Sequence, residues 1–229
     1  GEKQMAAWSK GQRLIFHIDV NSAFLSWECV YRLGRDPDAL DLRTIASAVG
    51  GDASTRHGIV LAKSPLAGKY GVTTGEPLAQ AMRKCPGLTV VPSRFDFYIK
   101  CSRQMMELLE EYTPDHEKFS IDEIFLDMTG TIHLFGSPLE TAHQIRRKIK
   151  HQLGFTVNIG ISTNKLLAKM ASDFEKPDKC HTLFPEEVPE KCGLCRYVNC
   201  SSWEGPPRRR WRTWACTPSA SWRPATWPC

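Results

Sequence analysis

Two adjacent carboxylates interrupt the apolar stretch Phe119-Ser120-Ile121-Asp122-Glu123-Ile124-Phe125-Leu126-Asp127. Neighbouring side chains of a β-strand point to opposite faces, so Asp122 and Glu123 both leave the core only where the chain turns or the strand ends. Uncompensated carboxylates in an apolar run are costly, and a divalent cation is their usual compensation. An acidic hairpin tip at the surface explains this stretch equally well when it is taken alone.

A second apolar strand ends on a carboxylate, in Leu14-Ile15-Phe16-His17-Ile18-Asp19-Val20-Asn21-Ser22-Ala23-Phe24. Two strands that each deliver a carboxylate at an end form a shared site for a hard cation if they lie side by side. Two metal ions bridged by carboxylates are a common device for phosphoryl transfer. The two stretches together therefore favour a metal site over an acidic hairpin tip.

Three motifs follow one another along the chain: Asp19-Val20-Asn21-Ser22-Ala23-Phe24, then Ser120-Ile121-Asp122-Glu123, then the segment from Asn158 to Pro177, which reads NIGISTNKLLAKMASDFEKP. With these motifs the sequence resembles a Y-family translesion DNA polymerase of the DinB/UmuC type, from about Leu14 to about Pro189. The resemblance implies that a dNTP is joined to a primer 3′-hydroxyl with two Mg²⁺ ions and release of pyrophosphate. It implies primer–template DNA and dNTP as partners, and a sliding clamp for a full-length member.

The resemblance also assigns the metal ligands. Asp19 and Asp122 would bind the metal ions, and Val20 would add its backbone carbonyl, a hard oxygen donor. Glu123, the third carboxylate of the family motif, would bind the catalytic metal near the primer 3′-hydroxyl. The alternative to a metal site is that Asp19 and Asp122 simply lie at strand ends that face solvent.

Three further features of the family map onto this chain. Phe24 matches the steric gate, whose ring leaves no room for a 2′-hydroxyl; the alternative is an ordinary core aromatic. Backbone N–H groups of Ser22, Ala23 and Phe24, at a helix start, would hold phosphate oxygens, and Ser22 is also a candidate helix cap. Lys176 matches the lysine that reaches the triphosphate; the alternative is a solvated lysine at a helix end.

One part of the chain departs from the family pattern. Many members carry a Tyr and an Arg, spaced Y-x-x-R, and both contact the triphosphate. Here Pro65 and Gly68 occupy those positions, and neither has a side chain that binds phosphate. Lys63 or Lys69 is a hypothetical substitute. The departure concerns nucleotide affinity rather than metal chemistry.

The pattern of apolar residues predicts an α+β fold. Without residues 35–92, the expected order is β-α-β-β-α-β, the ferredoxin-like order. In such a sheet we expect the first strand and the hairpin strands to lie centrally. We predict a disordered segment 1–13, a palm of residues 14–34 and 93–183, a fingers insertion of residues 35–92, and an irregular tail from 184 to 229. The expected strands are 14–19, 58–62, 88–91, 117–121, 124–128 and 155–160, and the expected helices are 23–33, 65–70, 77–84, 93–112, 139–152 and 164–173.

The tail differs in composition from the rest of the chain. Residues 192–229 hold five of the nine Cys and five of the seven Trp, and their six Arg and one Glu account for the whole net charge of +5. A zinc site at Cys180, His181, Cys192 and Cys195 and a nucleic-acid patch at 208–214 are two interpretations. A shift of the reading frame by one base near Lys191 explains the unusual composition better than either interpretation. Codons that encode residues 192–201 can be read in the shifted frame as MWPLPVRELF, which resembles the family sequence. We therefore expect a largely disordered, out-of-frame thumb remnant and weakened DNA binding.

Two other functions stay open. A nucleotide cyclase uses a similar palm, and Gly50-Gly51-Asp52 resembles its G-G-D motif without the acidic-aromatic pair that follows. A non-catalytic fragment that binds nucleotide or a partner is the alternative from another class. No run of 18 apolar residues occurs, and we see no apolar signal segment at the start, so we expect a cytoplasmic location and no membrane partner.

Overall fold

The computed structural model describes residue 9, residues 11–51 and residues 58–194. The chain divides into two compact units, residues 1–188 and 189–229. The tail was predicted to be irregular and largely disordered from 184 to 229, but its described part is helical over residues 185–194. Residues 195–229 of that tail lie outside the described residues, as does most of the segment 1–13. Among the described helices, none is long and apolar enough to cross a membrane.

The central feature of the first unit is a five-stranded sheet with the order β5-β6-β1-β7-β8. Its strands are β1 (Ile15–Val20), β5 (His116–Lys118), β6 (Glu123–Asp127), β7 (Val157–Ser162) and β8 (Cys180–Thr182). β1 pairs antiparallel with both β6 and β7, which confirms the ferredoxin-like order. The hairpin strand β5 lies at the sheet edge rather than centrally, and β8, which pairs parallel with β7, was not predicted.

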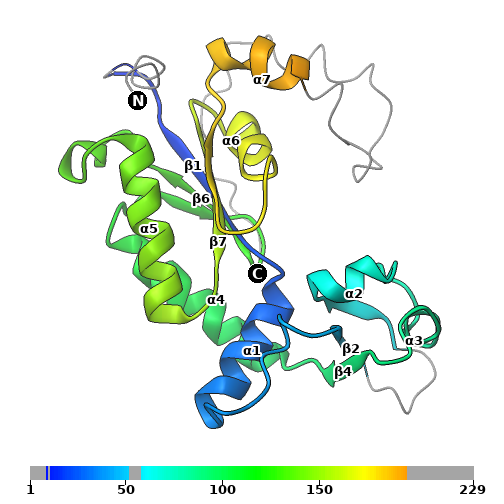
Figure 1. Cartoon of the computed structure of the whole chain (residues 1–229). Coiled ribbons are helices and arrows are strands. Elements are labelled where there is room, and N and C mark those ends of the chain that lie inside the picture. The colour runs from blue at the N-terminus through cyan, green and yellow to red at the C-terminus, as the bar shows by residue number, and fades with distance from the viewer. Residues whose placement is uncertain (1–8, 10, 52–57, 195–229) are drawn as a thin grey trace, which may run out of the picture. The chain divides into compact units, whose positions relative to one another are not determined.

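Helices cover both faces of this sheet (Figure 1). On one face, Phe16, Ile18 and Ile124 belong to a core that also contains residues of α1 (Ala23–Arg35), α4 (Phe95–Glu110) and α5 (Pro138–Leu153). The start of α5 is fixed by a capping box between Ser137 and Glu140. The apolar period predicted from the sequence therefore corresponds to the packed faces of these helices.

On the other face lies α6 (Lys165–Ser172), which packs closely on β7. A Cβ atom added at Gly160 would lie 1.9 Å from the carbonyl oxygen of Ala168. Only glycine fits there, because the helix backbone rests directly on the strand. The segment that follows α6, residues 173–179, then lies beside the end of β1 and the start of β7.

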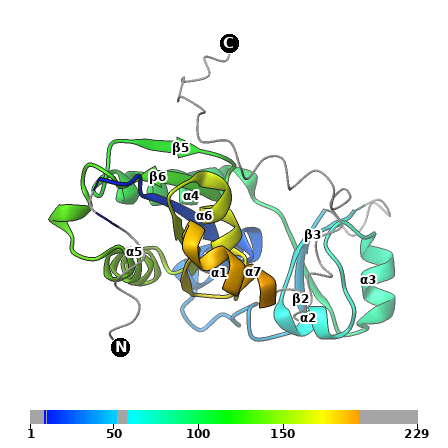
Figure 2. The same ribbon diagram turned by 90° about the horizontal axis from the view of Figure 1, so that it is seen from above.

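The described residues between 47 and 92 build a second, three-stranded sheet with the order β3-β2-β4; its strands β2 and β3 are labelled beside α2 and α3 in Figure 2. Its strands are β2 (Ser47–Gly50), β3 (Val60–Lys63) and β4 (Thr89–Pro92), and it carries α2 (Pro65–Lys69) and α3 (Leu78–Lys84). Strand β2 is not among the strands expected from the sequence, yet it forms the centre of this sheet.

Helix α1 contacts this second sheet as well as the first. Leu25 and Cys29 form a buried cluster with Val49, Ala62 and Val91. The remaining described elements are the short 3-10 helices Ile132–Leu134 and Pro185–Glu187, and α7 (Val188–Leu194). The second sheet, which lies in the segment predicted as a fingers insertion, is thus tied to the first sheet through α1, the helix that follows Asp19.

Candidate active site

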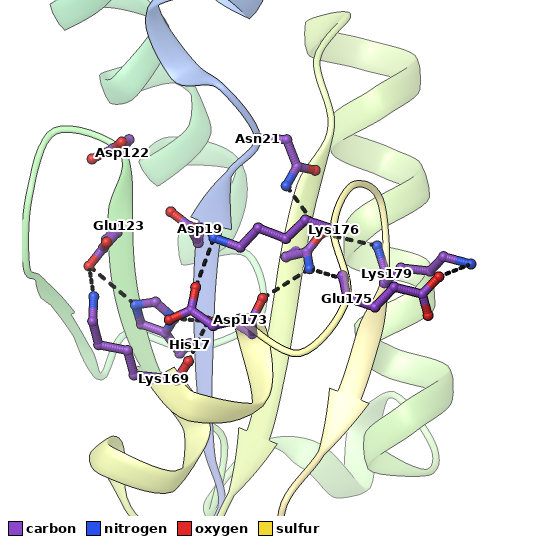
Figure 3. Close-up of polar contacts among 12 residues, drawn as sticks. His17, Asp19, Asn21, Asp122, Glu123, Lys169, Asp173, Glu175, Lys176 and Lys179 are labelled. Carbon is purple, nitrogen blue, oxygen red and sulfur yellow. Dashed lines mark hydrogen bonds and ion pairs between the residues drawn. The ribbon is translucent and has the colours of Figure 1, made fainter. Parts of the chain in front are cut away.

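Two of the three predicted carboxylates face each other across neighbouring strands. Asp19 at the end of β1 is the register partner of Glu123 at the start of β6. The Val20 N–H donates to the Asp122 carbonyl at 3.0 Å, so the Asp19–Glu123 pair is a non-hydrogen-bonded pair. In such pairs the side chains share one face and approach most closely. Figure 3 shows Asp19 between Glu123 and Lys176.

Asp19 is a buried carboxylate whose charge is compensated by a lysine. Its exposed fraction is 7%, and burial raises its pKa although Lys176 opposes the shift. Lys176 forms an ion pair with Asp19 and lies 2.9 Å from Asp173 Oδ1. Burial of the Lys176 ammonium lowers its pKa, but Asp19 and Asp173 together outweigh that effect and the pKa is raised.

Glu123 is held by a second cation and a histidine. His17 Nε2 lies 3.5 Å from Glu123 Oε2, and Lys169 of α6 forms an ion pair with the same oxygen. His17 and then Lys169 lower the Glu123 pKa to about 2. The other His17 nitrogen, Nδ1, is 2.8 Å from Ser172 Oγ, which fixes the orientation of the ring. Glu123 is therefore an ionised carboxylate with a defined orientation.

Asp122 has a different environment. It is half-buried, and its Oδ1 accepts a hydrogen bond of 2.6 Å from Ser120 Oγ. Figure 3 shows it beyond Glu123, without a contact to the other labelled side chains. Among the described residues, no group of three or more His, Cys, Asp or Glu side chains is arranged to hold a metal ion. The structure thus brings Asp19 to Glu123, and the ligand set with Asp122 and Val20 stays a proposal.

Phe24 lies in a cluster of aromatic rings at the start of α1. Its ring stacks on Tyr98 with a centroid distance of 5.3 Å and meets Phe95 edge-on at 5.6 Å. The preceding Ser22 is exposed and adopts a left-handed conformation with φ of 46°, and it makes no capping hydrogen bond with its side chain. The predicted cap is therefore wrong, while the phosphate-binding role of the N–H groups from Ser22 to Phe24 stays a prediction.

Lys63 and Lys69, the hypothetical substitutes for the missing Tyr and Arg, differ in their surroundings. Lys63 Nζ donates a hydrogen bond to the Val72 carbonyl, and it lies beside Gly68, where an added Cβ would be 3.7 Å from Nζ. Lys69 is exposed at the end of α2. Lys63 thus has a structural contact already, and Lys69 is the better candidate of the two.

Several residues near the carboxylates were not predicted to act there. His17 and Lys169 contact Glu123, Asp173 contacts Lys176, and Asn21 and Asn158 bond the segment before β8. The signal for His17 is its position two residues before Asp19, which places both on one face of β1. The signal for Lys169 and Asp173 is their spacing of four, which places Lys169 on the last turn of α6 and Asp173 directly after the helix.

Solved structures with the same fold define the class of protein. The chain matches a structure titled "Insertion ternary complex of Dbh DNA polymerase" with a TM-score of 0.68 and 30% identity, over 76% of this chain and 50% of that one. It matches the crystal structure of DinB from Sulfolobus solfataricus with a TM-score of 0.67 and 29% identity, over 76% and 49%. The fold is that of the palm and fingers of Y-family polymerases.

Residues 18–173 match the impB/mucB/samB family, and the chain belongs to that family. It is 54% identical over 179 residues to DNA polymerase IV of Clostridium acetobutylicum, covering 78% of this chain and 45% of that protein. It is 44% identical over 178 residues to DNA polymerase IV 1 of Bacillus subtilis, covering 78% and 41%. The chain therefore spans less than half the length of these relatives.

Proposed function

We propose that this chain carries the catalytic centre of an error-prone translesion DNA polymerase, which adds dNMP units to a primer 3′-hydroxyl on a DNA template. Family membership supports the reaction class. The observation that carries the proposal is the opposition of Asp19 and Glu123 on adjacent central strands. A ferredoxin-like palm needs this arrangement to place two hard-oxygen ligands at one point.

The residues fit two Mg²⁺ ions by their chemistry. Asp19, Asp122, Glu123 and the Val20 carbonyl all supply oxygen, the donor that Mg²⁺ prefers. Lys176 and Lys169 already place cationic charge against Asp19 and Glu123, so the site stabilises positive charge. Bound Mg²⁺ would supply charge stabilisation to the transferring phosphoryl group. This ligand set rests on the sequence motif and on the opposition of Asp19 and Glu123 across β1 and β6.

The other candidate residues bind and orient the nucleotide. Lys176 would leave Asp19 and bind the triphosphate as a point charge, together with N–H groups of Ser22, Ala23 and Phe24 at the start of α1. The Phe24 ring would exclude a 2′-hydroxyl. Primer–template DNA and dNTP are thus the proposed partners, and a sliding clamp is a further proposed partner of the full-length protein.

Primer extension tests the proposal. The purified chain, a labelled primer–template and each dNTP singly with Mg²⁺ should give incorporation of the complementary dNMP. Glu123→Gln should lower the rate by about 10²-fold or more, the effect of removing a group that stabilises transition-state charge. Glu117→Gln is the matched control, because Glu117 is an exposed carboxylate of the same sheet paired with Lys165 at 2.5 Å.

Three outcomes count against the proposal. If the Glu123→Gln variant extends the primer at the same rate as the unaltered chain, Glu123 does not take part in catalysis. Binding of dNTP with no incorporation would favour the non-catalytic fragment. A cyclic product from GTP alone would favour the cyclase, whose Asp52 lies outside the described residues.

A further inference from the structure

Two buried asparagines lie beside the segment that carries Lys176. Asn158, near the start of β7, has an exposed fraction of 0%, and Asn21, just after β1, has one of 8%. Asn21 Nδ2 donates to Asn158 Oδ1 at 3.1 Å. Neither asparagine is a candidate metal ligand, and the hydrogen bonds of their side chains go to each other and to backbone groups. Buried amides are costly unless they are hydrogen-bonded, so their partners show what they stabilise.

The partners are backbone groups between α6 and β8. Asn158 Nδ2 donates to the Ser172 carbonyl at 2.9 Å and to the Glu175 carbonyl at 2.6 Å. Asn158 Oδ1 accepts from the Lys179 N–H at 3.2 Å, and Asn21 Oδ1 accepts from the Asp178 N–H at 2.9 Å. These bonds fix the chain on both sides of Lys176, whose own side chain extends from the segment towards Asp19 (Figure 3).

The hydrogen bonds of Asn158 are complete. An amide side chain offers two donors and two acceptor positions, and Asn158 uses all four, one of them on Asn21. An apolar or hydroxyl side chain of similar size cannot reproduce this pattern. A second anchor of the segment, the ion pairs of Asp178 with Arg146 and Lys150, contacts α5. Asn158 bonds the carbonyls of Ser172 and Glu175, and His181 Nε2 also lies 3.3 Å from the Glu175 carbonyl oxygen.

We propose that Asn158 and Asn21 are positioning residues, which fix the backbone of residues 172–179 so that the Lys176 ammonium reaches the triphosphate of an incoming nucleotide. This inference rests on the proposed function. With the backbone fixed, Lys176 exchanges anionic partners by rotation of its side chain alone, and little conformational entropy is lost on binding. A mobile segment would lose that advantage and weaken nucleotide binding.

Calorimetric titration of the chain with dGTP and Mg²⁺, without DNA, tests the inference. Asn158→Leu should raise the dGTP Kd by about tenfold. This is the size of effect expected for a residue that does not contact dGTP but orients the side chain that does. Asn158→Ser is a milder variant should the leucine protein not fold, and it should shift the Kd in the same direction. Ser162→Ala is the matched control: Ser162 is buried on the same strand and donates to the Leu183 carbonyl at 2.6 Å, away from Lys176. Its Kd should stay unchanged.

A double variant separates positioning from general loss of structure. If Asn158 acts through Lys176, Asn158→Leu combined with Lys176→Ala should bind dGTP no more weakly than Lys176→Ala alone. Hydrogen exchange at the Asp178 and Lys179 amides should accelerate in Asn158→Ser and not in Ser162→Ala. Unchanged Kd values in both Asn158 variants, or additive effects in the double variant, would overturn this inference and leave the proposed function standing. Failure of the unaltered chain to bind dGTP would instead count against the proposed function and, with it, the inference.

Discussion

Asp19 and Glu123 lie directly opposite each other on β1 and β6, and each carboxylate forms an ion pair with a different lysine. Opposed carboxylates repel, and Glu123 contributes to the raised pKa of Asp19. Lys176 and Lys169 relieve that repulsion from the side of α6 and the segment after it. A divalent cation that binds both carboxylates must therefore compete with these lysines.

The competition predicts that Lys176→Met raises the affinity for Mn²⁺ in the absence of nucleotide, because the methionine cannot neutralise Asp19. The same variant should bind dNTP more weakly. Titration of Mn²⁺ followed by electron paramagnetic resonance measures the first effect, with Lys148→Met as control, because Lys148 is paired with Glu111 and does not contact the segment that carries Lys176. Weaker Mn²⁺ binding by the Lys176 variant would show that the lysine supports the site rather than competing for it.

Phe24→Ala should relax discrimination against ribonucleotides by about tenfold or more, within the range that removal of a side chain from a binding pocket produces. The ring is held in place by Tyr98 and Phe95, so its position is well defined. Incorporation of rNTP relative to dNTP in single-nucleotide extension measures the effect. Phe97→Ala removes another aromatic side chain, one that contacts Tyr31, and should keep the discrimination. Equal ratios in the two variants would make Phe24 an ordinary core aromatic.

The fingers lysines should separate into a structural and a binding residue. Lys63→Ala loses the hydrogen bond to the Val72 carbonyl and should lower the free energy of unfolding by about 1 kcal/mol. Lys69→Ala should leave stability unchanged and raise the KM for dNTP. Urea unfolding and steady-state extension test the two effects. An unchanged KM in the Lys63→Ala/Lys69→Ala double variant would end the idea that either lysine replaces the missing Tyr and Arg.

A pH-dependent contribution to stability is expected from Asp41. Its carboxylate accepts hydrogen bonds from the Arg43 side chain and from the Arg43 N–H at 2.9 Å, and these lower its pKa from 3.8 to about 2. A carboxyl that is more acidic in the folded state stabilises the fold above pH 3.8, and that stability is lost as the pH falls towards 2.

Asp41→Asn should therefore cost about 1 kcal/mol at pH 6, since solvent screens this partly exposed pair, and nearly nothing at pH 2. Urea unfolding at a series of pH values measures the difference, and Asp38→Asn, an exposed carboxylate nearby, is the control. A difference that does not change with pH would exclude the Arg43 interaction as its cause.

Strong apolar patterns made much of the palm predictable. The strand predicted at 14–19 is β1 at Ile15–Val20, and the helix predicted at 139–152 is α5 at Pro138–Leu153. Strands β2 and β8 were missed for physical reasons. β2 consists of Ser47-Ala48-Val49-Gly50, small residues without a strand-like alternation, and β8 has only three residues and depends on parallel pairing with β7.

The candidate site was predictable only in part. The motifs pointed to Asp19 and Glu123, but they do not show that each carboxylate forms an ion pair with a lysine. Lys176 and Asp19 are 157 residues apart in sequence, and their contact depends on how α6 packs on Gly160 and on how Asn158 holds the segment that follows. Such contacts are made by tertiary packing, and a local sequence pattern does not encode them.

The central claim is that carboxylates from β1 and β6 share metal ions under a nucleotide. A crystal structure of the chain with Mn²⁺ and a dNTP, with anomalous diffraction to locate the metal, tests it most directly. The account predicts Mn²⁺ within roughly 2–2.5 Å of oxygens of Asp19 and of Asp122 or Glu123, with the Lys176 ammonium moved from Asp19 to the triphosphate. Mn²⁺ bound elsewhere, with Lys176 still paired to Asp19, would contradict it.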